Sequence, residues 1–84
     1  MNARQRRTLA QVFADPVRGD IPWRDSEGLF GALGATVRQG AGSRVCVALN
    51  DVRAVFHRPH PERVTDKGAV RAVRRFLQTA GVQP

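Results

Sequence analysis

The stretch from residue 67 to residue 80 constrains the fold most, because its apolar residues follow the period of a helix. They recur at three- and four-residue steps and so share one stripe: Val70, Val73, Phe76, Leu77 and Ala80. Asp66 can accept hydrogen bonds from the free N–H groups of the first turn, and Gly81 can end the helix in the left-handed conformation. The segment therefore predicts a capped helix with a core face and a polar face.

The polar face of this helix is cationic. Lys67, Arg71, Arg74 and Arg75 share a stripe that no acidic residue interrupts. The whole chain has 14 Lys+Arg against 7 Asp+Glu, a formal net charge of +7, and Lys67 is its single lysine. Arginine offers a planar fork that suits phosphate oxygens and can stack on bases. Solubility or a GC-rich genome would also explain the arginines, but the clustering of charge favours a nucleic acid or an acidic protein as partner.

The chain of 84 residues predicts one domain, since a chain this short buries only roughly 60–65% of its unfolded surface. Asp15-Pro16 is expected to end a first helix, because proline cannot continue the hydrogen-bond ladder. The apolar pattern predicts these further elements: helices over 3–14 and about 24–33, strands over 35–38, 43–49 and 52–57, a connector over 17–22 and a loop over 58–65. The order helix, helix, three antiparallel strands, helix predicts an α+β domain with helices on one face of the sheet.

A two-residue turn at Asn50-Asp51 fixes the pairing of the two longer strands. Pairing outward from this turn brings Arg44 opposite His57, with Cβ atoms about 5 Å apart. Strand alternation places Arg53 on the same face, opposite to the apolar side chains, and Arg38 can join it from the first strand. The pattern therefore predicts a histidine within an arginine cluster on an uncovered sheet face.

Several short motifs resemble the HicA family of bacterial toxins in their order and spacing. They are GALGA at 31–35, Gly42-Ser43-Arg44, HRPHP at 57–61 and DKGAVRAVRRFLQTAGV at 66–82, so the resemblance covers roughly residues 21–82. It implies a fold like that of double-stranded-RNA-binding domains, α-β-β-β-α in two layers, with residues 1–20 as an additional N-terminal helix and connector. It also implies an endoribonuclease that cleaves mRNA, an mRNA interferase, neutralised by a HicB-like antitoxin.

One position departs from the pattern of that family, which usually has histidine directly after Gly-Ser, where this chain has Arg44. RNA cleavage without a metal needs a base, an acid and cations that stabilise the charge building on phosphorus. Our hypothesis is that His57 transfers the proton, while Arg44 occupies the family's catalytic position and binds the phosphate. The opposing interpretation is that both are surface residues, as a histidine at a strand end often is.

The remaining cationic and loop residues are expected to bind RNA through its backbone, which gives affinity without sequence information. His60 lies between Pro59 and Pro61 and faces either the RNA or an antitoxin, or is an ordinary loop histidine. The predicted RNA-binding residues are Arg38, Arg53, Arg58, His60, Lys67, Arg71, Arg74 and Arg75.

We expect neither a metal nor a cofactor, because His57-x-x-His60 with Cys46 is not a recognised zinc spacing. A single cysteine fits a reducing cytoplasm, and the chain shows no signal peptide and no membrane-spanning segment. The expected partners are RNA and a HicB-like antitoxin, and toxin and antitoxin could combine further into a higher-order assembly. The departure at Arg44 leaves two alternatives open: a non-catalytic RNA-binding module, or a domain whose basic face binds an acidic protein.

Overall fold

The computed structural model describes residues 1–84 and contains helices and short antiparallel sheets. The elements in chain order are α1 (Ala3–Val12), β1 (Ile21–Pro22), α2 (Trp23–Ala32), β2 (Thr36–Gln39), β3 (Arg44–Leu49), β4 (Val52–His57), β5 (Val64–Thr65) and α3 (Lys67–Thr79). The strand order in the larger sheet is β2-β3-β4, and β1 pairs with β5 in a separate two-stranded sheet.

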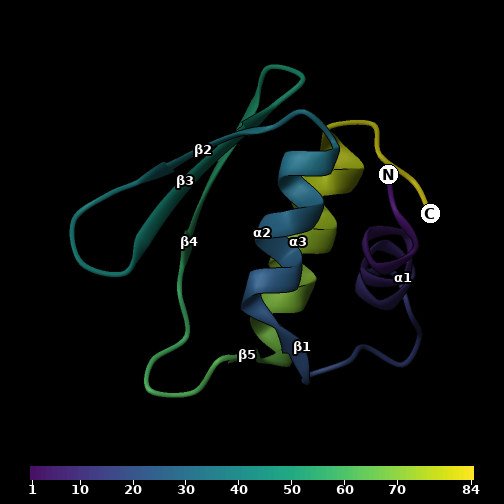
Figure 1. Cartoon of the computed structure of the whole chain (residues 1–84), viewed down its shortest axis with the longest axis horizontal. Helices are drawn as coiled ribbons and strands as arrows, with labels where there is room; N and C mark the ends of the chain where they lie inside the picture. The colour runs from purple at the N-terminus through teal and green to yellow at the C-terminus, as the bar shows by residue number, and fades with distance from the viewer.

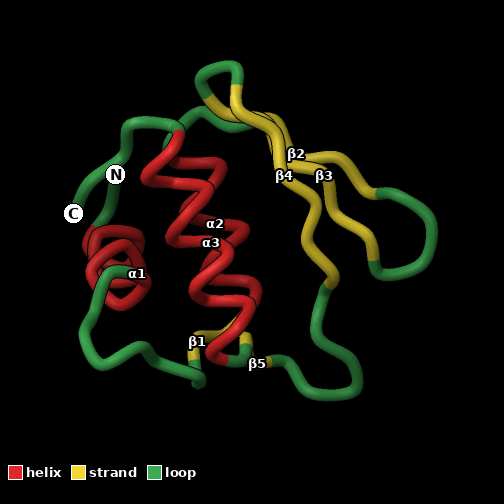
Figure 2. The backbone as a smooth tube through the Cα atoms, turned by 180° about the vertical axis from the view of Figure 1, so that it is seen from behind, coloured by secondary structure: helices red, strands yellow, loops and turns green.

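The elements form layers that Figure 1 shows side by side. The β2-β3-β4 sheet is one layer, the α2 and α3 helices cover one of its faces, and α1 packs on the far side of those helices (Figures 1 and 2). The predicted α+β fold, an α-β-β-β-α two-layer arrangement with an additional N-terminal helix, is confirmed. The other face of the sheet has no helix over it.

The predicted register of the hairpin is confirmed. Asn50 and Asp51 form the turn with positive φ angles of 50° and 66°, as a two-residue hairpin requires. Leu49 pairs with Val52, and the ladder runs outward until Arg44 pairs with His57. The side-chain amide of Asn50 also donates to the carbonyl oxygen of Ala80 at 2.8 Å, which ties the turn to the end of α3. This hydrogen bond joins the tip of the hairpin to the helical layer.

The core lies between the sheet and the α2–α3 layer. The inward-facing side chains of β3 and Phe56 of β4 are buried, Val52 and Ala54 are partly buried, and the predicted apolar stripe of α3 is buried. An aromatic cluster fills the centre: the ring of Phe30 stacks on that of Phe56 at 5.7 Å and meets that of Phe76 edge-on at 5.9 Å. Trp23 closes one side of this cluster, with its ring 6.2 Å from that of Phe30. The predicted caps also form, since Asp66 accepts from the N–H of Ala69 at 2.8 Å and Gly81 has a left-handed φ of 86°.

The connector predicted over 17–22 and the loop predicted over 58–65 were wrong in part. Ile21 pairs with Thr65 and Pro22 with Val64, so each segment contains a two-residue strand. Buried Ile21 supplies the physical reason, because its side chain joins the core and draws its backbone against the segment that precedes α3. This small sheet fixes the start of both covering helices.

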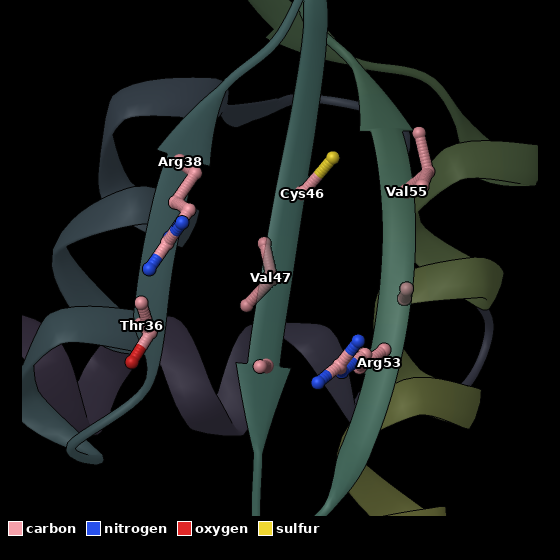
Figure 3. Close-up of a pocket in the computed structure, with 8 residues that line it drawn as sticks. Thr36, Arg38, Cys46, Val47, Arg53 and Val55 are labelled. Carbon is pink, nitrogen blue, oxygen red and sulfur yellow. The ribbon is translucent and has the colours of Figure 1, made fainter.

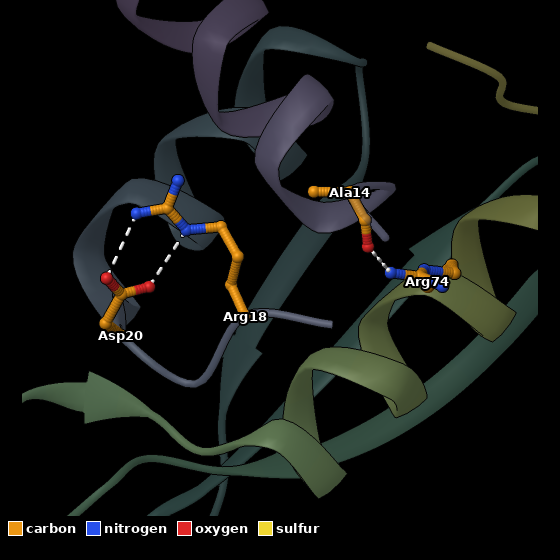
Figure 4. Close-up of polar contacts among 4 residues, drawn as sticks. All are labelled: Ala14, Arg18, Asp20 and Arg74. Atoms are coloured by element: carbon orange, nitrogen blue, oxygen red, sulfur yellow. Dashed lines mark hydrogen bonds and ion pairs between the residues drawn. The ribbon is translucent and has the colours of Figure 1, made fainter. Parts of the chain in front are cut away.

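The first helix ends at Val12, earlier than the expected residue 14, and a side chain of α3 binds its end. The Arg74 guanidinium donates from Nε to the carbonyl oxygen of Val12 at 2.8 Å and from Nη2 to that of Ala14 at 2.6 Å. Figure 4 shows the second of these hydrogen bonds. These carbonyls have no helical N–H partners, so a cation at this point satisfies them and interacts favourably with the helix dipole. Arg74 therefore anchors α1 to the rest of the domain.

The connector after α1 carries an exposed ion pair. Arg18 donates two hydrogen bonds of 3.0 Å to the carboxylate of Asp20 (Figure 4). These hydrogen bonds hold the pKa of Asp20 below its ordinary value and raise the pKa of Arg18. Both side chains are in solvent, so this pair shapes the connector and adds little to the stability of the fold.

Replacing Arg74 with methionine, which keeps an unbranched stem, is expected to lower the free energy of unfolding by about 1.5–3 kcal/mol, the usual loss for hydrogen bonds to a charged group. Urea denaturation followed by circular dichroism measures this change. Arg75→Met is the matched control, because Arg75 is the exposed neighbour on α3, and its replacement should change stability by less than about 0.5 kcal/mol. Equal stability of the two variants would contradict the anchoring role.

Candidate nucleic-acid interface

The uncovered face of the sheet is basic and has no carboxylate. Alternation along the paired strands puts these side chains on it: Thr36, Arg38, Arg44, Cys46, Ala48, Arg53, Val55 and His57. We call this set the outer face. Figure 3 shows Arg38, Cys46 and Arg53 on neighbouring strands around a shallow hollow of ≈ 480 Å³. An open concave face with cations and no anions attracts negatively charged ligands.

The Arg44–His57 pair lies at one end of the outer face. The two residues are direct partners in the β3–β4 ladder, so their Cβ atoms are about 5 Å apart. Both are exposed, and neither side chain makes a hydrogen bond or an ion pair with another residue. Both polar groups are therefore free to bind a ligand at this end of the outer face.

The other two arginines of the outer face lie further along the strands. Arg38 pairs with Cys46, which is the next residue after Arg44 along β3 whose side chain lies on the outer face. Arg53 pairs with Ala48, which is four residues from Arg44 and therefore about 13 Å away along the strand. The structure thus brings the predicted cations onto one face but spreads them in rows. Such a line of charges matches an extended chain of phosphates better than a single small anion.

Two predicted residues, Arg58 and His60, follow directly after β4. The backbone N–H of Arg58 donates to the carbonyl oxygen of Ser43 at 2.9 Å, which extends the strand pairing one step past the Arg44–His57 pair. The Arg58 side chain turns toward α2, with its Nε 3.7 Å from a carboxylate oxygen of Glu27. His60 is exposed in the loop beside Ser43. Both residues adjoin the outer face without belonging to it.

The cationic stripe of α3 points in another direction. Lys67, Arg71 and Arg75 are exposed on the side of α3 away from its buried stripe, whereas the outer face lies beyond the sheet that α3 covers. Arg74 is the exception within the stripe, because its guanidinium is engaged with α1. The structure does not bring the stripe together with the outer face, and RNA binding by the stripe remains a prediction.

Other candidates for chemistry are sparse. Cys46 is half-buried in the middle of the outer face. No group of three or more His, Cys, Asp or Glu side chains is placed to hold a metal ion. The chemistry that this surface offers is therefore that of an imidazole among guanidinium groups.

Sequence reasoning missed Glu27 as a neighbour of the site. Its carboxylate accepts a hydrogen bond from the indole N–H of Trp23 and is the nearest anion to Arg58. The spacing of four residues between Trp23 and Glu27 was the available signal, because side chains so spaced meet on a helix. The partner across the loop, Arg58, had no such local signal.

A small α+β domain with a basic, carboxylate-free and open sheet face has the charge distribution that suits a polyanionic ligand. Residues 23–82 match the family described as HicA toxin of bacterial toxin–antitoxin. The match spans most of the chain, so this protein belongs to the HicA toxin family and is a toxin of a bacterial toxin–antitoxin pair. The resemblance predicted from the sequence is confirmed. Residues before Trp23, including α1, lie outside the match.

No match was found among curated proteins, and none among solved structures. None of the helices has the length and the apolar character needed to cross a bilayer.

Proposed function

We propose that this toxin is a metal-independent endoribonuclease that cleaves mRNA and blocks translation in the cytoplasm until a HicB-like antitoxin binds it. The observation that carries the proposal is the Arg44–His57 pair, exposed on a basic outer face of a HicA-family domain. We further propose that residues 1–84 act as one domain, with residues 1–20 as an addition to the family fold.

The proposed reaction uses the 2′-hydroxyl of the RNA as nucleophile. His57 accepts the 2′-hydroxyl proton while the 2′-oxygen bonds to phosphorus, and the bond from phosphorus to the 5′-oxygen breaks. Water protonates the departing 5′-oxygen. Arg44 donates hydrogen bonds to the non-bridging phosphate oxygens, whose charge increases in the transition state. The products are a 2′,3′-cyclic phosphate end and a 5′-hydroxyl end.

The roles of the two residues follow from their chemistry. Imidazole changes protonation near neutral pH and is therefore suited to proton transfer. A guanidinium stays protonated, so Arg44 can hold and stabilise the phosphate but cannot serve as the base. The paired Cβ spacing of about 5 Å lets the two groups approach the same phosphodiester from neighbouring strands.

A second candidate function is RNA binding without cleavage. The observation that favours it is Arg44 itself, since the resemblance leads one to expect histidine after Gly42-Ser43. Under this alternative the outer face still holds RNA, but His57 has no part in a reaction. A third candidate, binding of an acidic protein through the same face, predicts no RNA affinity at all.

Incubation of the purified protein with a defined mRNA in EDTA separates these candidates. The proposal predicts cleavage that EDTA does not stop and products with cyclic phosphate and 5′-hydroxyl ends, which end-labelling enzymes distinguish. RNA that is retained but stays intact would favour the binding module. RNA that is neither retained nor cut would favour the protein-binding domain.

A further inference from the structure

A second hollow lies beside the Arg44–His57 pair, off the end of the outer face. It has a volume of ≈ 460 Å³, and its lining residues are Gly42, Ser43, Arg58, Pro59 and His60. This volume falls within the range of about 300–1,000 Å³ that is typical of sites for small organic ligands. The turn before β3 forms one wall, and the loop after β4 forms the other.

The chemistry of the lining selects the kind of ligand. Ser43 offers a hydroxyl, Arg58 a guanidinium and His60 an imidazole, the ring of Pro59 is the apolar side chain among them, and no carboxylate lines the hollow. The lining therefore disfavours a cation and gives an apolar group only the ring of Pro59 to bury against. It suits an anion that also carries a flat, hydrogen-bonding group, which is the composition of a nucleotide.

The walls of the hollow are held in place by backbone contacts. The hydrogen bond of 2.9 Å from the Arg58 N–H to the Ser43 carbonyl joins them directly. Pro59 and Pro61 flank His60 and fix the backbone φ angles on either side of it. His60 is thus presented to solvent from a stiff segment and loses little freedom when a ligand binds.

The Arg58 side chain is positioned from the interior. Its Nε is buried without a hydrogen-bond partner, and the carboxylate of Glu27 lies 3.7 Å away. The Arg58 side chain as a whole is 39% exposed. Because Nε is buried, the exposed area belongs to the other atoms of the side chain. Glu27 in turn accepts from the indole of buried Trp23. The guanidinium is therefore directed by the core while part of it remains open to a ligand.

We propose that this hollow is the subsite for the nucleotide next to the phosphodiester held at the Arg44–His57 pair. Arg58 and Ser43 bind the phosphate of that nucleotide, and the ring of His60 stacks on its base. Ser43 directly precedes Arg44, and Arg58 directly follows His57, so a strand of RNA lying on the pair continues into the hollow. The inference rests on the proposed function, because it assumes that RNA occupies the outer face.

The test measures binding of a single-stranded 2′-O-methyl RNA decamer, which has no 2′-hydroxyl and cannot be cleaved by the proposed reaction. Fluorescence anisotropy at several salt concentrations and pH 8 gives the Kd and its salt slope. His60→Ala should raise the Kd roughly tenfold, as the loss of one stacked base does, with little change of slope. Arg58→Met should reduce the salt slope by about 0.7, the value for one phosphate contact on a single strand.

Two further variants keep the test decisive. Arg58→Lys retains the charge without the planar fork, so the slope should stay near that of the wild type. Arg6→Met removes an exposed cation from α1, on the far side of the helices, and should leave both quantities unchanged. Thermal unfolding confirms that each variant is folded before binding is compared.

The outcomes separate this inference from the proposed function. Wild-type protein that cleaves RNA, combined with unchanged binding by His60→Ala and Arg58→Met, would overturn the subsite and leave the nuclease in place. Altered binding by both variants supports the subsite even where cleavage is not observed. Failure of the wild type to bind the decamer would overturn the subsite and remove the basis for RNA on the outer face.

Discussion

Replacing Phe30 with alanine is expected to lower the free energy of unfolding by about 3–5 kcal/mol, the usual loss for a buried phenylalanine. Phe30 is fully buried, and its ring contacts those of Phe56, Phe76 and Trp23, which come from the sheet and from both covering helices. Truncation therefore opens a cavity where the two layers meet. The total free energy of unfolding of a small domain is about 5–15 kcal/mol, so this variant should be close to unfolding.

Urea denaturation followed by circular dichroism measures this loss. Val55→Ala serves as the control, because Val55 is a 53% exposed apolar residue on the outer face. Its replacement should lower the free energy of unfolding by at most about 1 kcal/mol. A Phe30→Ala variant that unfolds within about 1 kcal/mol of the wild type would show that the aromatic cluster does not hold the layers together.

Replacing His57 with alanine is expected to lower the cleavage rate at saturating RNA by roughly 10²–10⁴-fold, the usual contribution of a positioned acid or base. His57 is the exposed last residue of β4, and its side chain makes no hydrogen bond or ion pair with another residue, so the fold should be unaffected. The Kd for RNA should change by less than about threefold, because an imidazole gives little of the phosphate affinity that the arginines supply.

Single-turnover cleavage with labelled RNA separates the rate from the affinity. Arg44→Ala should lower both, since the proposed role of its guanidinium is to bind the phosphate before and during the reaction. His60→Ala is the control for loss of a nearby imidazole, and at saturating RNA it should keep most of the rate. If His57→Ala cleaves as fast as the wild type, His57 is not the base, and the search moves to other residues near Arg44.

The parts of the fold that could be predicted are those with a local and periodic signal. The positive φ angles at the Asn50-Asp51 turn and the two-residue alternation of the strands are both set within a few residues. Together they determine that Arg44 faces His57. The same holds for α3, whose apolar stripe and Asp66 cap are consecutive in the sequence. The pairing of Arg44 with His57 could therefore be predicted from the amino-acid sequence.

The parts that could not be predicted depend on contacts between distant segments. A two-residue strand is too short to show an alternating apolar pattern, so neither segment by itself predicts the pairing of Ile21 with Thr65. The position of Arg74 in a cationic stripe predicts only that its side chain lies on the polar side of the helix. Its bonds to the carbonyls of α1 depend on where that helix docks, 60 or more residues away in the chain. Arg58 and Glu27 are a similar case.

The placement of RNA on the outer face of the sheet is tested most directly by a two-dimensional ¹H–¹⁵N NMR titration. The protein is 9.2 kDa, which suits this method. Adding the 2′-O-methyl decamer to the labelled wild type reports every backbone amide, whether or not the protein cleaves RNA.

The account predicts that the largest shifts occur in β2, β3 and β4 and at the loop that carries His60, with Arg44 and His57 among the first to change. Amides of α1 should stay in place, because that helix lies beyond the covering layer. Shifts confined to α1 and to the exposed side of α3, with the sheet unchanged, would contradict the account and move the nucleic-acid surface to the opposite side of the molecule.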